Sequence, residues 1–179
     1  MEALSKILKT SLTIVLLLLA FQTKAQEDQK LVTFVIKNAG IGVDGFFTEY
    51  DVTAEFDPSD LANSSFSATI ESNTIDTGIG ARDRHLKKAK YFDVENYPQI
   101  KLVSTSISKT STGYLLKANL TIKKTTLPVE IPFTVTKTEA GNVFEGTFTM
   151  DRRDYGVGKN HLILGDEVRI KIYHLEKTG

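Results

Sequence analysis

The sequence contains no cysteine and no tryptophan, and only four prolines and three histidines among its 179 residues. Without cysteine the chain forms no disulfide and offers no thiol nucleophile or thiolate metal ligand. Domains of about 150 residues bury roughly 70% of the surface of the unfolded chain, so no crosslink is needed for a stable core. We therefore expect one domain that is stabilised by burial alone.

An excess of positive charge is also absent. The chain carries 22 basic and 22 acidic side chains, and residues 26–179 have a net charge of −2. Proteins that bind nucleic acid need a basic surface to neutralise phosphates. The charge balance therefore argues against nucleic acid as a partner.

Motifs of the common catalytic and metal sites are missing as well. The sequence has no HExxH motif and no Gly-x-Ser-x-Gly elbow. Asp83 and His85 form a ligand-type pair at close spacing, whereas His161 and His174 lie far from them in the sequence. No pair of carboxylates stands out as an acid–base couple. These absences favour a protein with no metal and no cofactor that is not an enzyme.

The long apolar run of a membrane anchor is missing, although a shorter run is present. Lys6 and Lys9 precede the apolar stretch 12–21, and Thr23-Lys24-Ala25 supplies small residues after it. About ten apolar residues are too few for a membrane span, which needs roughly 20. The layout predicts a signal peptide over residues 1–25, cut after Ala25, and a domain over residues 26–179. A lipid anchor at the cleavage site is excluded by the lack of cysteine, and we expect a periplasmic or secreted protein.

Alternation of apolar and polar residues dominates the chain after residue 30. In 126–136, for example, every second residue is apolar from Leu127 to Val135. This period predicts strands with one buried face, as in antiparallel sheets. The eight predicted strands are 31–37, 43–56, 65–72, 99–107, 113–123, 126–136, 143–150 and 166–175. Eight such strands can form a sandwich or a closed barrel, and alternation alone does not choose between them.

Two of the predicted strands contain irregular residues. The segment 43–56 is long enough to need a bend, which we place at Gly45. Pro128 and Pro132 lie on the polar face of 126–136. Because proline cannot donate to a ladder, we expect this strand to pair incompletely on one side.

The segment 73–98 interrupts the strands with a long, charged excursion. Excursions of this length inside a compact β-domain are usually functional or disordered. We expect a short helix within 79–90, docked by Leu86 and Ala89, that covers one end of a barrel. Its basic cluster consists of Arg82, Arg84, His85, Lys87, Lys88 and Lys90. The cluster is either a cationic rim for an anionic or polar head group or a solvated helix face, and Arg82 and Asp83 are alternatively structural.

Several motifs occur in an order that resembles the YceI-like family. They include Glu55-Phe56-Asp57-Pro58, Ile75-Asp76-Thr77-Gly78, Arg82-Asp83-Arg84-His85-Leu86 and Arg153-Asp154-Tyr155-Gly156. The segment Tyr91 to Pro98, with sequence YFDVENYP, also fits the family. The chain departs from the family pattern at 123–126, where many relatives have a turn with His and Gly.

The resemblance implies an eight-stranded antiparallel, lipocalin-like barrel with a long loop and short helix between its third and fourth strands. It implies a lipid-like ligand, such as a polyisoprenoid, quinone or fatty-acid-like molecule, held for transport, storage or sequestration. By this resemblance Arg82, Asp83 and His85 shape the mouth. The residues implied to line the interior are Phe47, Ile70, Tyr91, Phe92, Leu102, Leu116, Leu120, Phe133 and Phe148.

Three alternatives remain from the residues. The interior is either hollow or filled by packed side chains, in which case the protein is a structural or interaction module. The protein is alternatively an enzyme that acts on an amphiphile, with Asp83 or His85 required for turnover. A homodimer and a transient contact with a membrane surface also stay open.

Overall fold

The computed structural model describes residues 32–160 and 162–177. The predicted signal peptide and its cleavage site lie outside this range. Within the described residues, no helix is long and apolar enough to cross a membrane.

The described residues form ten strands, one short 3₁₀-helix (η1) and one α-helix (α2). In chain order the elements are β1 (Val32–Asn38), β2 (Ile41–Phe47), β3 (Tyr50–Glu55), β4 (Ser65–Glu71), η1 (Ser72–Thr74), β5 (Ile75–Asp76), α2 (Gly80–Leu86), β6 (Gln99–Lys109), β7 (Tyr114–Ile122), β8 (Thr125–Thr138), β9 (Gly141–Asp151) and β10 (Leu164–Lys177).

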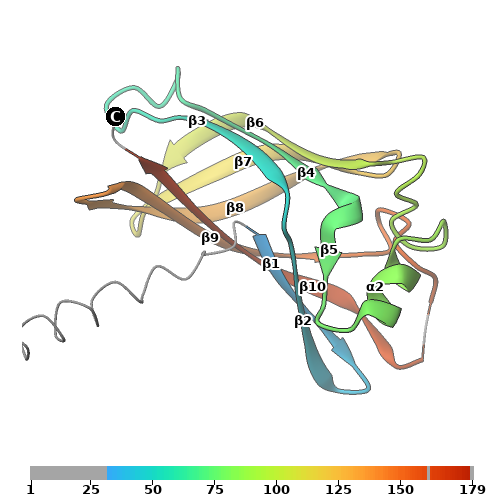
Figure 1. Cartoon of the computed structure of the whole chain (residues 1–179). Helices are drawn as coiled ribbons and strands as arrows, with labels where there is room; N and C mark the ends of the chain where they lie inside the picture. The colour runs from blue at the N-terminus through green and yellow to red at the C-terminus, as the bar shows by residue number, and fades with distance from the viewer. Residues whose placement is uncertain (1–31, 161, 178–179) are drawn as a thin grey trace, which may run out of the picture.

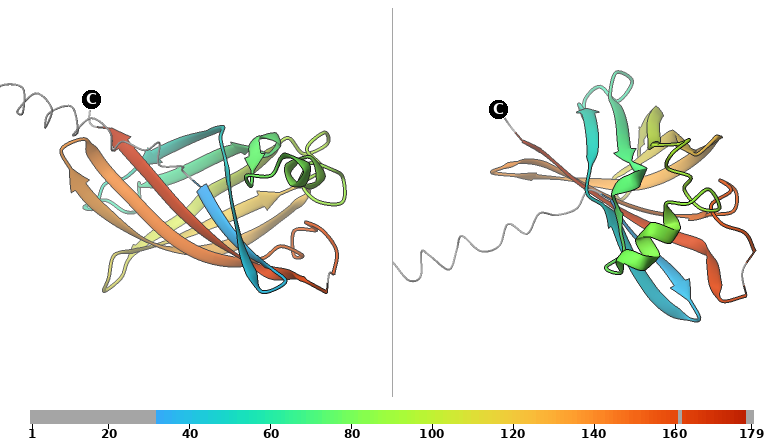
Figure 2. Two further views of the ribbon diagram at one scale, coloured as in Figure 1. Left: turned by 60° about the horizontal axis from the view of Figure 1, so that its bottom comes forward. Right: turned by 45° about the vertical axis from the view of Figure 1, so that its right-hand side comes forward.

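All ten strands belong to one antiparallel sheet with the order β3-β4-β6-β7-β8-β9-β10-β1-β2-β5. The sheet curls so that its far-apart strands face each other across the interior (Figures 1 and 2). The chain itself links the two sides of the curl, because β2, which is next to β5 at one end of the order, continues into β3 at the other end. The predicted all-β antiparallel barrel is confirmed, whereas the predicted number of strands is wrong.

The strand count differs because the predicted strand 43–56 is broken in two. The break lies at Thr48 and Glu49, whose backbone N–H groups both donate to the hydroxyl of Thr74, at 3.2 Å each. The carbonyl of Glu49 accepts from the backbone N–H of Glu71 at 3.0 Å. The side chain of Thr74 in η1 thus takes the place of a strand partner at this corner. The residues that follow, Ile75–Asp76, form the additional short strand β5, which pairs with Phe46 and Phe47.

The predicted bend at Gly45 is wrong. Gly45 lies within β2, paired with Phe34 of β1. A Cβ atom on Gly45 would overlap the ring of Phe34. The glycine therefore makes room for an aromatic side chain of the neighbouring strand and leaves β2 straight at this position.

Incomplete pairing of the proline-containing strand is confirmed. The ladder between β8 and β7 runs without a break from Thr125 to Phe133. The ladder between β8 and β9 contains only the residues from Phe133 to Thr138 on the β8 side. The half of β8 that contains Pro128 and Pro132 therefore pairs with one neighbour alone.

The excursion between β4 and β6 folds over one end of the barrel (Figures 1 and 2). Its helix α2 is shorter than the predicted 79–90 and ends at Leu86. Leu86 packs against the core, as predicted, but Ala89 is exposed and does not dock.

The interior contains two clusters of apolar side chains. One includes Phe47, Ile70, Ile100 and Leu120 and lies toward the end that α2 covers. The other includes Leu116, Ile131, Phe133 and Phe144. Leu102, Val129 and Phe148 pack against both clusters, which marks the middle of the barrel.

Candidate functional site

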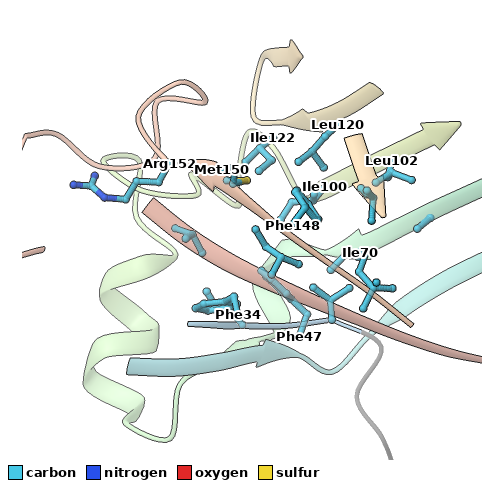
Figure 3. Close-up of a pocket in the computed structure, with 18 of the residues that line it drawn as sticks. Phe34, Phe47, Ile70, Ile100, Leu102, Leu120, Ile122, Phe148, Met150 and Arg152 are labelled. Carbon is cyan, nitrogen blue, oxygen red and sulfur yellow. The ribbon is translucent and has the colours of Figure 1, made fainter. Parts of the chain in front are cut away.

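An apolar cavity of about 260 Å³ lies between the two clusters. This volume is far above the roughly 10–15 Å³ that a single water molecule requires. Figure 3 shows side chains from opposite walls, such as Phe34 and Ile122, converging on it. The barrel is thus hollow, which is not what a filled-core module would show.

Aromatic side chains close the end of the cavity that lies away from α2. Phe133 stacks on Tyr114 with ring centroids 5.3 Å apart, and Phe66 meets Phe144 edge-on at 5.2 Å. Phe56 contacts all four of these rings, with centroids between 5.0 and 6.0 Å. Edge-to-face packing of this kind is favourable beyond simple burial. These five rings form an aromatic plug that closes this end of the cavity with apolar surface.

The opposite end is covered by the excursion. Phe92 meets Phe47 edge-on at 5.9 Å, and Tyr91 is 8% exposed within the same cluster. Both residues line the cavity together with Leu86 of α2. The cover thus presents apolar groups inward.

Arg82 and Asp83 share one partner, Thr77. The guanidinium of Arg82 donates from Nε to Thr77 Oγ1 at 2.7 Å and from Nη2 to the Thr77 carbonyl. The Asp83 carboxylate accepts from the Thr77 hydroxyl and from its backbone N–H, the latter at 3.0 Å. These bonds hold α2 to the strand β5 that precedes it, so both residues fix the excursion. Arg82 also lines the cavity, whereas Asp83 does not.

His85 lies apart from Asp83. It is exposed, and its ring packs against Tyr91 with centroids 5.0 Å apart. Two residues apart on a helix, Asp83 and His85 point in different directions. The structure therefore brings only Arg82, of the three predicted mouth residues, to the cavity.

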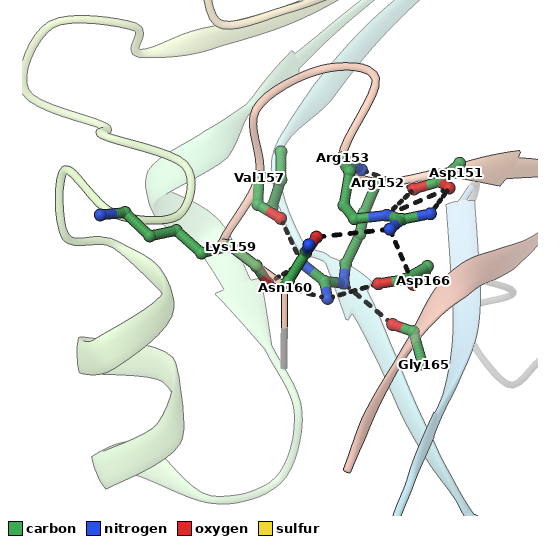
Figure 4. A network of polar contacts seen from close by, with 8 residues as sticks. All are labelled: Asp151, Arg152, Arg153, Val157, Lys159, Asn160, Gly165 and Asp166. Atoms are coloured by element: carbon green, nitrogen blue, oxygen red, sulfur yellow. Dashed lines mark hydrogen bonds and ion pairs between the residues drawn. The ribbon is translucent and has the colours of Figure 1, made fainter. Parts of the chain in front are cut away.

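A buried arginine holds the second loop at this end, between β9 and β10. Arg152 is 3% exposed and donates to the carbonyls of Val157 and Gly165 at 2.8 and 2.9 Å. It also donates to the carbonyl of Lys159 and forms an ion pair with Asp166 at 2.8 Å (Figure 4). A buried charge is tolerated only when it is paired and hydrogen-bonded in this way. Arg152 is the first residue of the β9–β10 loop, and its hydrogen bonds hold this loop in place.

Lys123 ties the two loops together. It occupies the β7–β8 turn with a φ of 56°. Its Nζ donates to the carbonyl of Ala89 at 3.2 Å and to that of Gly156 at 3.1 Å. A direct backbone bond from Gly158 N–H to the Lys90 carbonyl, at 2.9 Å, joins the same loops. The covered end is thus closed by polar contacts as well as by apolar packing.

All nine residues implied to line the interior do line this cavity: Phe47, Ile70, Tyr91, Phe92, Leu102, Leu116, Leu120, Phe133 and Phe148. Their contact with a ligand stays a prediction. Phe34, Ile36, Ile100, Met150 and Arg152 also line the cavity and were not anticipated. Phe34, Ile36 and Ile100 follow the alternation of β1 and β6, which could have predicted them. Nothing in the sequence around Arg152 indicates that it is buried.

Few ionisable groups reach the cavity. Burial lowers the pKa of His174 at its edge, and the charge of Glu176 opposes this effect only partly. No group of three or more His, Asp or Glu side chains in the described residues is placed to hold a metal ion. The site therefore suits retention of an apolar group by burial.

A family model described as a YceI-like domain matches residues 24–174 of the chain. A UPF0312 protein of Pectobacterium atrosepticum is 33% identical over 101 residues, which are 56% of this chain and 53% of that protein. Protein YceI of Salmonella arizonae matches with the same identity and coverage. The match thus spans about half the length of these curated relatives.

Solved structures with the same fold include BcnA of Burkholderia cenocepacia, with 30% identity and a TM-score of 0.75 over 79% of this chain and 92% of that one. The YceI protein of Campylobacter jejuni has 21% identity and a TM-score of 0.69 over 76% and 85%. A polyisoprenoid binding domain from Saccharophagus degradans has 13% identity and a TM-score of 0.60 over 81% and 93%. The family model covers most of the length of this chain, so the chain belongs to the YceI-like family.

Proposed function

We propose that this protein is exported to the periplasm or secreted, and that it holds a long amphiphilic ligand inside its barrel. The ligand class is a polyisoprenoid, a quinone or a fatty-acid-like lipid, kept for transport, storage or sequestration. The observation that carries the proposal is the apolar cavity of about 260 Å³. The predicted signal peptide supports export.

Burial of apolar groups is the main source of affinity that the cavity offers such a ligand. Transfer of one methylene group from water into an apolar site contributes about 0.8 kcal/mol. Ten buried methylenes would contribute roughly 8 kcal/mol before the cost of ordering the ligand is subtracted. The walls need no charged group for this purpose, and a ligand with a small polar end is favoured over a highly charged one.

The fold comparison supports the same class of ligand. The structurally similar domain of Saccharophagus degradans is described as polyisoprenoid binding. At 13% identity this likeness supports the fold and not the identity of the ligand. The choice among isoprenoid, quinone and fatty chain therefore rests with experiment.

Binding without turnover is favoured by the contacts of the two candidate catalytic residues. The carboxylate of Asp83 is engaged by Thr77, and the ring of His85 lies against Tyr91 outside the cavity lining. Neither side chain is aimed at a group held in the cavity. The rival, an enzyme acting on an amphiphile, would be favoured if Asp83→Asn or His85→Ala abolished turnover and left binding intact.

Native mass spectrometry of the protein purified from its own envelope tests the proposal. We expect an additional mass that is released on denaturation and extracts into organic solvent. Leu116→Arg should abolish it, because Leu116 is 7% exposed and lines the cavity. Leu115→Arg is the matched control, since Leu115 is the adjacent residue and is not part of the lining.

Two results would contradict the proposal. One is retention of the same lipid by folded Leu116→Arg protein, with folding checked by circular dichroism. Phe133→Arg provides a second interior variant if Leu116→Arg does not fold. The other is a bare protein that also fails to bind added isoprenoids and fatty acids.

A further inference from the structure

Among the described strands, the wall of the barrel lacks backbone pairing along part of the boundary between β8 and β9, as it also does between β3 and β5, the two ends of the sheet order. We define the β8–β9 seam as residues 125–132 of β8 and 147–151 of β9. The β8–β9 ladder ends at the pair Phe133 and Gly146, although each strand continues along its other neighbour. Figures 1 and 2 show β8 and β9 diverging from this pair toward the end of the barrel that α2 covers.

The two prolines of β8 explain why the seam is unpaired. The β7–β8 ladder is unbroken at Pro128 and Pro132, which are opposite Asn119 and Leu115. Because proline has no N–H to donate, an intact ladder at both positions places their ring nitrogens on the side of β9. The edge of β8 that faces β9 therefore lacks two donors. The seam is encoded in the sequence and does not depend on a local distortion.

Side chains, not backbone bonds, fill the seam from inside. Leu127 and Val129 of β8 and Phe148 and Met150 of β9 are half-buried and pack against the same apolar cluster. Separation of the strands would break only these apolar contacts. An entering apolar chain would replace them, whereas at a paired strand it would have to break hydrogen bonds with no substitute.

A second hollow lies on the outer side of the wall where the seam begins. It has a volume of about 460 Å³ and shares Phe133, Glu145, Gly146 and Ile172 with the inner cavity. Gly146 has no side chain to thicken the wall at this point. The rest of the outer lining consists of Thr33, Thr112, Thr134, Thr147, Lys171, Tyr114, Tyr173 and Pro132. Its hydroxyl groups and the Lys171 ammonium stand beside apolar surface, whereas the inner cavity is almost wholly apolar.

Both ends of the barrel are closed by stronger contacts. The aromatic plug around Phe56 closes one end, and at the other Lys123 and Arg152 hold the two loops by hydrogen bonds to backbone carbonyls. Opening of the covered end would break the two hydrogen bonds of Lys123 and the backbone bond from Gly158 to Lys90. Opening of the seam breaks no ladder hydrogen bond.

We propose that the β8–β9 seam is a lateral portal through which the amphiphile enters and leaves, with the outer hollow receiving its polar end. The proposal rests on the proposed function, since it concerns the route to the same cavity. It replaces the expectation that the ligand passes the mouth at Arg82, Asp83 and His85.

Crosslinking tests the portal directly, because the chain has no cysteine of its own. Glu130→Cys and Thr149→Cys introduce one thiol on each side of the seam, at exposed positions that would be opposite if the ladder continued. A bismaleimide then joins the strands, and mass spectrometry verifies the link. The control is Lys90→Cys with Lys159→Cys, two exposed positions that flank the backbone bond between the loops at the covered end.

The measured quantity is the rate of uptake and of release of cis-parinaric acid, a fluorescent long-chain fatty acid. We expect the seam crosslink to slow both rates by about tenfold or more at unchanged affinity, because a gate affects entry and exit equally. The loop crosslink should leave both rates within about twofold of the unlinked protein.

Unchanged rates in the seam-linked protein, or slowing by the loop link instead, would overturn the portal. Failure of the unlinked protein to take up the probe is a separate result, seen before any link is made. That failure would count against the proposed function itself. The two proposals can thus fail independently.

Discussion

Gly45 of β2 and Phe34 of β1 are cross-strand partners, and the ring of Phe34 occupies the space where a Cβ atom on Gly45 would lie. The same ring packs against Phe47 with centroids 5.9 Å apart and lines the cavity. The absence of a side chain at residue 45 thus sets how an aromatic residue lies in the wall of the candidate binding site.

Gly45→Ala should therefore lower the free energy of unfolding by about 1–3 kcal/mol, as expected when a group is forced into an occupied space. Urea denaturation followed by circular dichroism measures the change. The control is Gly42→Ala in the same strand, where a Cβ atom would meet only Val35 Cγ1, at 3.5 Å. Equal stability of the two variants would contradict the role of Gly45.

The adjacent arginines of the β9–β10 loop should differ greatly in their effect on stability. Arg152→Ala removes a buried guanidinium, leaves several carbonyls without their donor and leaves Asp166 paired with Arg153 alone, which should cost about 3–5 kcal/mol. Arg153→Ala removes ion pairs to Asp151 and Asp166 from a side chain that is 42% exposed, and should cost only about 1 kcal/mol. Chemical denaturation of both variants checks the order, and a larger effect at Arg153 would refute it.

Lys123→Met should loosen the covered end without unfolding the barrel. The substitution removes two hydrogen bonds, to the carbonyls of Ala89 and Gly156. Hydrogen exchange should become faster in both 87–91 and 154–158, while the unfolding free energy changes by about 1 kcal/mol or less. Lys124→Met is the matched control, because the neighbouring Lys124 is exposed and makes no hydrogen bond within the described residues. Unchanged hydrogen exchange in Lys123→Met would show that the two hydrogen bonds of Lys123 do not stabilise the covered end.

Protonation of His174 should destabilise the fold. Burial holds the pKa of His174 in the folded protein below its ordinary value of about 6.5. As the pH falls through this value the unfolded chain binds a proton that the folded protein does not, so stability is lost on acidification and is fully present above it. His174→Gln should flatten the dependence of unfolding free energy on pH between about pH 7 and 5.

A steeper pH dependence in His174→Gln, or a histidine NMR titration that places His174 above its ordinary pKa, would contradict this account.

Strand positions and inward faces could be predicted because alternation is a local property. Leu116 and Leu120 of β7 and Phe148 of β9 line the cavity on the face that their spacing indicates. The two prolines of β8 likewise predicted incomplete pairing, since their missing donors do not depend on the partner strand.

The break of the long strand could not be predicted, because its cause lies 25 residues away in the sequence. Thr74 supplies the hydroxyl that accepts from Thr48 and Glu49. Thr77, by contrast, lies only five and six residues before Arg82 and Asp83, and its bonds to both agree with the alternative that these residues are structural. Contacts of this kind form only when η1, β5 and α2 are already in place.

The sequence by itself determined the antiparallel strands, the apolar character of their inner faces and the unpaired edge of β8, because spacing and residue type act within a single strand. Tertiary structure decided that the inner face encloses a cavity, since the volume left depends on how opposite walls and the two ends meet. It also placed Arg152 in the interior, where the carbonyls of its own folded loop and the carboxylate of Asp166 compensate for the buried charge.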